Sequence, residues 1–210
     1  SELIEKKQLS PLHIRVLVLE HNKNDKRMMK DKTYQQEMEF LSTSMKRNQF
    51  IRSLVCATNG NILVLAQYIE KQLVPLCNMI VDHCGEKRTV HLIYGATPTD
   101  DREKVRHLVE NDDNAVIVAS YGTFSTGVNI KKIHAIIFAS PYKSQVKILQ
   151  SLGRGLRMSE DKDHLELFDI ADDLRYNNKD NYTLKHLQER IRIYSEQSFD
   201  YDIVPVKLDK

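Results

Sequence analysis

The sequence lacks any run of apolar residues long enough to cross a lipid bilayer, and its first residues do not show the pattern of a secretory signal. It also lacks internal repeats and low-complexity tracts. Of its 210 residues, 41% are hydrophobic and 29% are charged, which is an ordinary profile for a soluble globular protein. We therefore expect one domain with a short extension, located in the cytoplasm.

Cysteine is scarce and charge of either sign is not in excess. Cys56, Cys77 and Cys84 are widely spaced and form no Cys-x-x-Cys pair, so we expect reduced thiols and no metal site. The formal net charge is only +2, which does not by itself indicate a nucleic-acid partner. Any basic surface must therefore be local.

Short apolar segments alternate with amphipathic ones along the chain. Strands are predicted at residues 13–20, 62–66, 90–94, 115–119, 134–139, 165–170 and 201–206, and helices at 33–56, 68–84, 97–110, around Gln150, and at 182–196. Residues 22–32 are expected to form a charged loop, and a Thr or Asp side chain is expected to cap the helix at 97–110. This alternation predicts an α/β domain with a mostly parallel central sheet between two helical layers.

In such sheets, ligands bind beyond the carboxyl ends of the strands. The loop at residues 120–130 follows a buried strand there and contains four serine or threonine side chains and two glycines. Small hydroxyls and exposed backbone N–H groups are suited to contacts with phosphates. An ordinary Ser/Gly loop is the alternative interpretation.

Residues 150–157 are the most informative stretch. In a helix, Gln150, Arg154 and Arg157 would share one narrow face, with leucines opposite. The planar arginine side chain suits phosphate because it donates to two oxygens at once. A solvated helix face with two ordinary arginines is the alternative.

Taken together, these segments resemble the second RecA-like domain of superfamily 2 helicases. Residues 150–157 read Gln-x-x-Gly-Arg-x-x-Arg and resemble motif VI, residues 120–130 resemble motif V, and residues 62–67 resemble the weaker motif IV. Tyr94-Gly95 followed by Arg102 resembles the unit between motifs IV and V. Residues 181–201 further resemble the tail of phage helicases that act in recombination and replication-fork remodelling.

The resemblance implies a set of nucleotide-binding residues. Arg157 would be the arginine finger, Arg154 its neighbour on the γ-phosphate, and Gln150 a sensor of that phosphate. Gly127 and Asn129 would lie near the ribose, although many relatives carry an acid where Asn129 stands. The implied cofactors are ATP and Mg²⁺ in the full-length enzyme.

The resemblance also implies a nucleic-acid track, with Ser120 and Gln67 touching the phosphates of single-stranded or branched DNA. Arg102 would join them, or would be an ordinary surface arginine. The implied divisions are a tether at 1–12, a RecA-like domain at 13–180, and a helix and strand at 181–210 packed on it. The implied partner is the N-terminal RecA-like domain of the same polypeptide. We expect no association with a membrane and a monomeric state for the fragment.

The C-terminal helix carries both basic and aromatic residues. Its basic and aromatic side chains could contact DNA, namely Lys185, His186, Arg190, Arg192, Tyr182 and Tyr194. Packing of the helix on the sheet through its apolar face is the alternative. A non-catalytic RecA-like module that binds nucleic acid or protein is the second functional class.

One required motif is missing. The seven glycines stand at 60, 85, 95, 122, 127, 153 and 155, and none opens a Gly-Lys-Ser/Thr loop that could cradle phosphates. Asp172-Asp173 follows motif VI and so cannot be the magnesium-binding acid pair of the family. We therefore expect this chain to supply half of a motor.

We predict that the chain alone hydrolyses no ATP, because it lacks the phosphate-cradling loop. Phosphate release with and without Mg²⁺ is the measurement. A robust metal-dependent activity that is abolished by Arg157→Ala would contradict the prediction.

Overall fold

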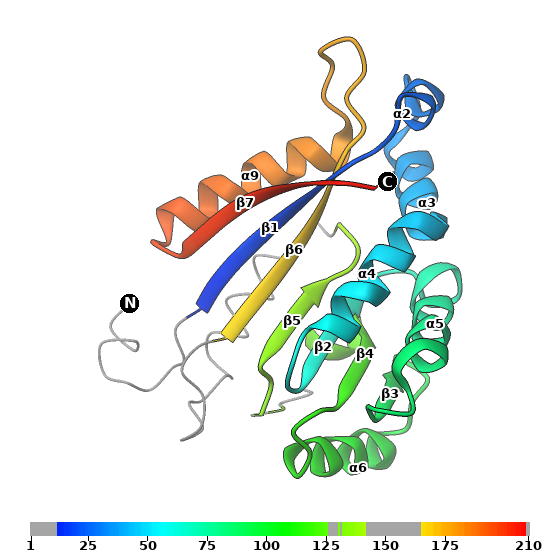
Figure 1. Cartoon of the computed structure of the whole chain (residues 1–210), viewed down its shortest axis with the longest axis vertical. Coiled ribbons are helices and arrows are strands. Elements are labelled where there is room, and N and C mark those ends of the chain that lie inside the picture. The colour runs from blue at the N-terminus through cyan, green and yellow to red at the C-terminus, as the bar shows by residue number, and fades with distance from the viewer. Residues whose placement is uncertain (1–11, 126–129, 131, 142–164, 209–210) are drawn as a thin grey trace.

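The computed structural model describes residues 12–125, 130, 132–141 and 165–208. Seven parallel strands form one sheet in the order β3 (Val90–Ile93), β4 (Val116–Ser120), β2 (Ile62–Ala66), β5 (Ala135–Phe138), β6 (Leu165–Asp173), β1 (Leu12–Glu20) and β7 (Asp200–Lys207) (Figure 1). Every residue of β2, β4 and β5 is buried, as continuous apolar strands covered on both faces require. The predicted α/β fold with a parallel sheet is confirmed.

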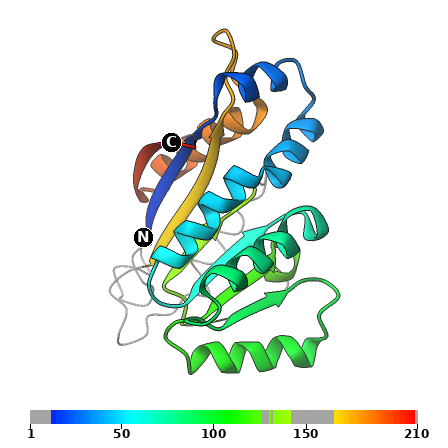
Figure 2. The same cartoon turned by 45° about the vertical axis from the view of Figure 1, so that its right-hand side comes forward.

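Helices cover both faces of this sheet. The described helices are α2 (Lys23–Met29), α3 (Tyr34–Thr43), α4 (Met45–Ala57), the π-helical turn η1 (Ile69–Leu73), α5 (Val74–Cys84), α6 (Thr99–Glu110), α7 (Tyr121–Ser125) and α9 (Tyr182–Glu196). Side chains of α4, η1 and α5 pack into the core on one face, and those of α6 and α9 pack into the core on the other. Figure 2 shows α4 and α5 in front of the sheet and α9 behind it.

Three local predictions were wrong. Residues 22–32 contain helix α2, which Asn22 starts by accepting a hydrogen bond from the Asp25 N–H. The single helix predicted at 33–56 is two helices, because Ser44 has an extended backbone and its hydroxyl caps α4. Helix α6 begins after Pro98 with no side-chain cap, where a Thr or Asp cap was expected.

The turn before β2 depends on Gly60. Its φ is +80°, and a Cβ at this position would lie 2.6 Å from the His134 ring. Glycine is therefore required both for the left-handed backbone and for the close approach.

All three cysteines are free. Cys56 on α4 and Cys84 on α5 nevertheless bring their Sγ atoms to 2.7 Å, a proximity that their sequence spacing does not indicate. Burial, followed by the hydrogen bond with Cys84, raises the pKa of Cys56 to about 12. No helix among the described residues is long and apolar enough to span a membrane.

Helix α9 is fixed to the sheet by a buried charge cluster. Arg190 Nε and Nη2 donate to the two Asp169 oxygens at 2.8 and 3.0 Å, and the Tyr194 hydroxyl donates to Asp169 at 2.8 Å. Arg190 is 4% exposed and Tyr194 is fully buried. The hypothesis that these two side chains contact DNA is therefore wrong, because they belong to the core.

The start of α9 is fixed by Glu37 of helix α3. The buried carboxylate accepts from the N–H groups of Tyr182 and Thr183, from the Thr183 hydroxyl and from the Asn181 amide, at 2.7 to 3.0 Å. These are the first N–H groups of a helix, which carry partial positive charge and lack partners within the helix. One acid thus joins two helices that lie 145 residues apart in sequence.

We predict that Glu37→Ala lowers the free energy of unfolding by about 2–3 kcal/mol, because buried donors lose a charged acceptor. Urea unfolding followed by circular dichroism is the measurement. Glu39→Ala is the matched control on the same helix. Among the described residues, the Glu39 side chain forms only an exposed ion pair with Lys71, so its loss should cost less than about 1 kcal/mol. Equal losses for the two variants would contradict the capping role.

Candidate nucleic-acid and nucleotide interface

The carboxyl ends of β4, β2 and β5 lie side by side in the sheet (Figure 1). Ser120 is opposite Ala66, and Leu65 is opposite Phe138. The register therefore brings together Gln67, Ser120 and Ser140, which follow or end these three strands. These are the positions at which parallel sheets bind ligands.

The hydroxyl of Ser140 connects two of these strand ends. It accepts a hydrogen bond from the Gln67 N–H at 3.0 Å and donates to the Gln72 side-chain oxygen. The carbonyl oxygen of Ser140 accepts from the Tyr121 hydroxyl at 2.8 Å. The backbone N–H of Gln67 is therefore fixed by Ser140, which is itself held by Gln72 and Tyr121.

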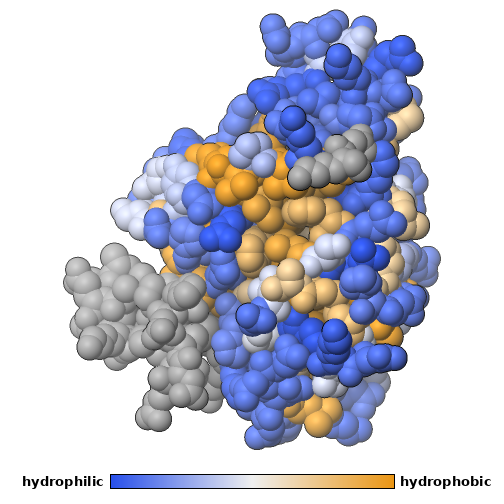
Figure 3. Space-filling model, in the orientation of Figure 1, coloured by the Kyte–Doolittle hydropathy of each residue, from blue (hydrophilic) through white to orange (hydrophobic). Residues whose placement is uncertain are grey.

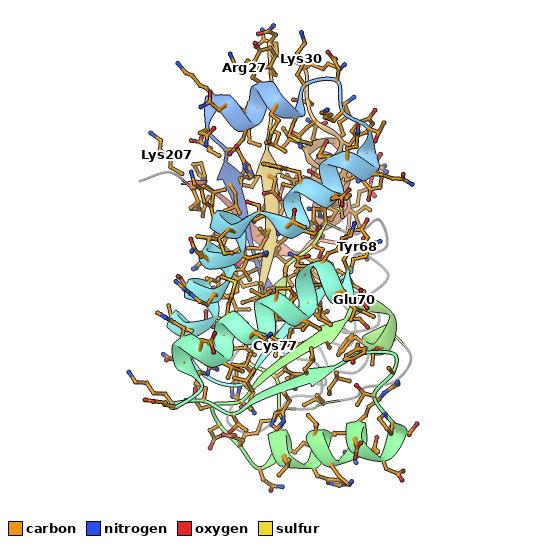
Figure 4. All side chains as sticks on the ribbon, turned by 90° about the vertical axis from the view of Figure 1, so that its right-hand side faces the viewer. Arg27, Lys30, Tyr68, Glu70, Cys77 and Lys207 are labelled. Carbon is orange, nitrogen blue, oxygen red and sulfur yellow. The ribbon has the colours of Figure 1, made fainter. Side chains whose placement is uncertain are left out.

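The side chain of Gln67 has unused hydrogen-bonding capacity. Its Oε1 atom is buried and makes no hydrogen bond in the part of the chain that the structure describes. An unsatisfied buried acceptor is costly, so such a group is informative at the end of a central strand. Tyr68 and Glu70, which follow Gln67, mark this edge of the molecule in Figure 4.

Ser120 is placed at the same edge, but its hydroxyl is occupied. The side chain is buried, and its Oγ lies 2.8 Å from the Thr123 hydroxyl and accepts from the Thr123 N–H at 3.4 Å. Ser120 thus caps the short helix α7, which the sequence did not predict. A direct phosphate contact requires the Ser120 hydroxyl to donate to the ligand, either while it accepts from the Thr123 hydroxyl or in place of its bond to Thr123.

Arg102 is bound to its own loop. Its Nε donates to the Thr97 carbonyl at 2.8 Å and its Nη2 to the Gly95 carbonyl at 3.0 Å. The side chain therefore ties α6 to the loop after β3. This structural role accounts for an arginine here without a ligand.

A buried ion network lies next to this edge, and the sequence did not predict it. Arg47 on α4 donates from Nε to both Asp172 oxygens at 3.0 Å and from Nη1 to the Ala139 carbonyl. His21, at the end of β1, brings Nε2 to 2.9 Å from Asp172. The network joins β1, β5, β6 and α4. The sequence signal that could have indicated this network is the acid pair Asp172-Asp173 at the end of an apolar strand, because a buried charge needs a partner.

The charge of Asp172 depends on this network. Burial alone would raise the pKa of Asp172. The positive charge of Arg47 and the hydrogen bond with His21 outweigh this effect and lower the pKa from its ordinary value of 3.8 to about 2. Asp172 is therefore ionised at neutral pH although it is fully buried. Removal of either partner would leave an uncompensated charge in the core.

The five nucleotide-binding residues inferred from the sequence lie outside the described residues. They are Gly127, Asn129, Gln150, Arg154 and Arg157. Of the predicted site residues, the structure therefore places Gln67 and Ser120 together at neighbouring strand ends, and Arg102 near the end of β3.

The sheet order, the helical layers and the polar strand ends define a RecA-like domain of the helicase type. Residues 45–159 match the family model described as "Helicase conserved C-terminal domain". This match covers more than half of the chain, and the chain belongs to that family.

Within the family, the chain is similar to the "ATP-dependent DNA helicase uvsW" of Enterobacteria phage T4, with 30% identity over 99% of this chain and 43% of the relative. The crystal structure of T4 UvsW superposes with a TM-score of 0.80 over 94% of this chain and 42% of that one. This chain thus spans less than half the length of that relative.

A more distant structure shows the same fold. The type ISP restriction-modification enzyme LlaBIII, solved bound to DNA, has a TM-score of 0.63 at 17% identity. It matches 98% of this chain and 16% of the enzyme.

We predict that Asp172→Asn lowers the free energy of unfolding by about 3–5 kcal/mol at pH 7, because the Arg47 charge stays buried without its partner. The double variant Arg47→Met/Asp172→Leu should lower the free energy of unfolding by less than a change of Arg47 or Asp172 alone, because it leaves neither charge buried without its partner. Asp180→Asn is the control, since Asp180 is half-exposed and bonds only Gln188 among described groups.

The pH dependence gives a second readout of the same variant. The folded pKa of about 2 lies below the ordinary value of 3.8, so the Asp172 contribution is present above about pH 4. It is lost as the pH falls toward 2. The stability difference between wild type and Asp172→Asn should therefore shrink over this window, and a constant difference would contradict the assignment.

Proposed function

We propose that this chain is the C-terminal motor domain of an ATP-dependent DNA helicase or translocase that acts in recombination, branch migration and replication-fork remodelling. The observation that carries the proposal is the 30% identity with the T4 DNA helicase over 99% of the chain. The similarity includes the region of the Gln-x-x-Gly-Arg-x-x-Arg stretch at 150–157, within the family match at 45–159.

In this proposal, the chemistry of ATP hydrolysis is shared between two domains. ATP with Mg²⁺, when bound, supplies the transferable phosphoryl group. Arg157 and Arg154 place fixed positive charge where negative charge develops on the phosphates, and Gln150 bonds near the γ-phosphate. Gly127 permits close approach of the backbone, and Asn129 bonds a ribose hydroxyl.

The nucleic-acid contact is proposed for the strand ends of β2 and β4. Gln67 is suited to it because its side chain has unused hydrogen-bonding capacity and its backbone is held by Ser140. Ser120 contributes through its position at the start of the 120–130 loop, and Arg102 by fixing the loop after β3. Contacts of this kind hold a phosphate backbone and read no sequence.

The buried network beside these strand ends supports the mechanical side of the proposal. A motor domain must move as a unit when nucleotide binding closes two domains. Arg47, Asp172 and His21 connect three strands and one helix by buried hydrogen bonds and ion pairs. The loops can then respond to ligands while the sheet that carries them stays rigid.

We predict that Arg157→Ala in the full-length protein lowers kcat for ATP hydrolysis by about 10³-fold or more, because the transition state loses its positive charge. The Kd for single-stranded DNA should change by less than about threefold. Steady-state ATPase assays and fluorescence anisotropy are the measurements.

Lys104→Ala is the control, because Lys104 forms an exposed ion pair with Asp101 on α6. It should leave both quantities unchanged. Equal losses of kcat and DNA affinity in Arg157→Ala would count against the arginine-finger role. Full ATPase activity of that variant would overturn the motor assignment and favour a non-catalytic binding module.

A further inference from the structure

A second polar surface lies at the carboxyl ends of β1 and β6. A groove of about 220 Å³ opens between the end of α2, the turn that follows β6 and the start of α9. Its walls include Lys30, Lys32, Tyr176, Lys179, Tyr182 and Lys185, and we refer to it as the Lys/Tyr groove. Figure 3 shows that the end of the molecule that carries α2 is almost entirely hydrophilic, and Figure 4 shows Arg27 and Lys30 there.

The lysines of this groove are available to an anion. Lys30 and Lys179 are 50% and 71% exposed, and both lie near Asp31, with Nζ–O distances of 3.9 and 3.2 Å. Such exposed ion pairs contribute little and are screened by salt, so a phosphate can compete with them. Lys32 and Lys185 are exposed and form no ion pair within the described residues.

The groove contains four lysines and three acids, so a formal charge of +1 remains. The Glu37 carboxylate is fully used by four donors at the start of α9. It also occupies the N-terminus of that helix, so the anion site is the lysines and not the helix end. Asp180 is bonded to Gln188 at 3.0 Å.

Two tyrosines give the groove an aromatic lining. Tyr182 is 45% exposed, and the Tyr34 ring packs against it edge-on with a centroid distance of 6.1 Å. Tyr176 has the Lys30 ammonium 5.6 Å from its ring centroid. The rings are therefore positioned beside the lysines, as in proteins that stack bases and bind the adjacent phosphates.

The backbone holds these side chains in place. Asn177 and Asn178 both have left-handed conformations, with φ of 48° and 62°. Two such residues in succession form the tight turn that suits a two-residue hairpin, and asparagine tolerates it. Tyr176 and Lys179 flank the turn and exchange backbone hydrogen bonds of 3.0 and 3.3 Å. The groove is thus largely preformed.

We propose that the Lys/Tyr groove binds single-stranded DNA, with phosphates on the lysines and a base on Tyr176 or Tyr182. The groove lies at the same carboxyl edge of the sheet as Gln67 and Ser120, on the side of β6 and β1. It therefore lengthens the contact with a strand held at β2 and β4. The proposal rests on the proposed function only for the identity of the nucleic acid.

The first test uses charge reversal, with a labelled oligothymidylate as the probe. The groove variant is Lys32→Glu/Lys179→Glu/Lys185→Glu, and the control is Lys87→Glu/Lys104→Glu/Arg192→Glu on exposed sites elsewhere. Both take the formal net charge from +2 to −4. Arg192 is ten residues from Tyr182 on the same helix, about 15 Å along its axis.

The groove variant should bind about tenfold or more weakly near physiological salt. Its slope of log K against log salt should fall by about 2, because three phosphate contacts on a single strand are lost. The control should keep its slope and lose less than about threefold in affinity. Equal losses in both variants would show a general charge effect and overturn the proposal.

The second test separates stacking from charge. Tyr176→Ala/Tyr182→Ala should weaken binding about fivefold or more, whereas Tyr176→Phe/Tyr182→Phe keeps the ring faces and should bind like wild type. Both pairs keep the backbone contact of Tyr182 with Glu37. Thermal melting checks that each variant is folded, and cross-linking of a bromodeoxyuridine oligonucleotide should label the peptide that contains Tyr176 and Tyr182.

The outcomes separate this inference from the motor assignment. If both groove variants bind DNA like wild type while Arg157→Ala abolishes ATP hydrolysis, the groove is not a DNA site and the motor assignment stands. If the groove variants lose DNA affinity in a protein without ATPase activity, the groove stands and the motor assignment does not. Labelling of peptides only from the Gln67 and Ser120 region would also overturn the groove.

Discussion

The ionised pair of Arg47 and Asp172 is the interaction on which the carboxyl edge of the sheet depends. Two charges without access to water are stable only when each is fully paired, so the pair fixes α4 against β6 and, through the Ala139 carbonyl, against β5. His21 adds β1 to the same cluster. The strand ends at which we propose that ligands bind are therefore held by contacts that are shielded from water.

Glu37 and Asp169 apply the same principle to helix α9. Each buried acid is satisfied by several donors from that helix, one at its start and one near its end. The helix is thereby fixed at two points, and the groove at its first turn keeps a defined shape. Polar contacts in this domain thus position the elements, while apolar packing on the two sheet faces supplies most of the stability.

Much of the fold could be predicted from the sequence because its signals are local. Short continuous apolar segments such as Ile62–Ala66 indicate buried strands when turn residues flank them, and α9 was predicted with its observed bounds from its helical periodicity. The break at Ser44 could not be predicted, since an amphipathic pattern runs through it. Gln67 and Ser120 were predicted to share a nucleic-acid track because of the helicase resemblance, and ligands of parallel sheets bind beyond the carboxyl ends of the strands. The observed hydrogen bonds of Ser120 and Arg102 were not predicted, because their partners lie in a helical turn and a loop that exist only in the folded chain.

The sequence by itself determined the fold class, the family and the order of the helicase motifs, because each can be identified from short contiguous stretches of residues. Only the tertiary structure decided which charged side chains are buried and which remain available. Arg190 and Lys185 lie five residues apart on one helix, yet the first is paired in the core and the second lines an open groove. The physical reason is that burial and pairing depend on what each face of a helix meets, and those groups lie on other segments of the chain, such as Asp169 of β6 for Arg190 and Lys30 at the end of α2 for Lys185.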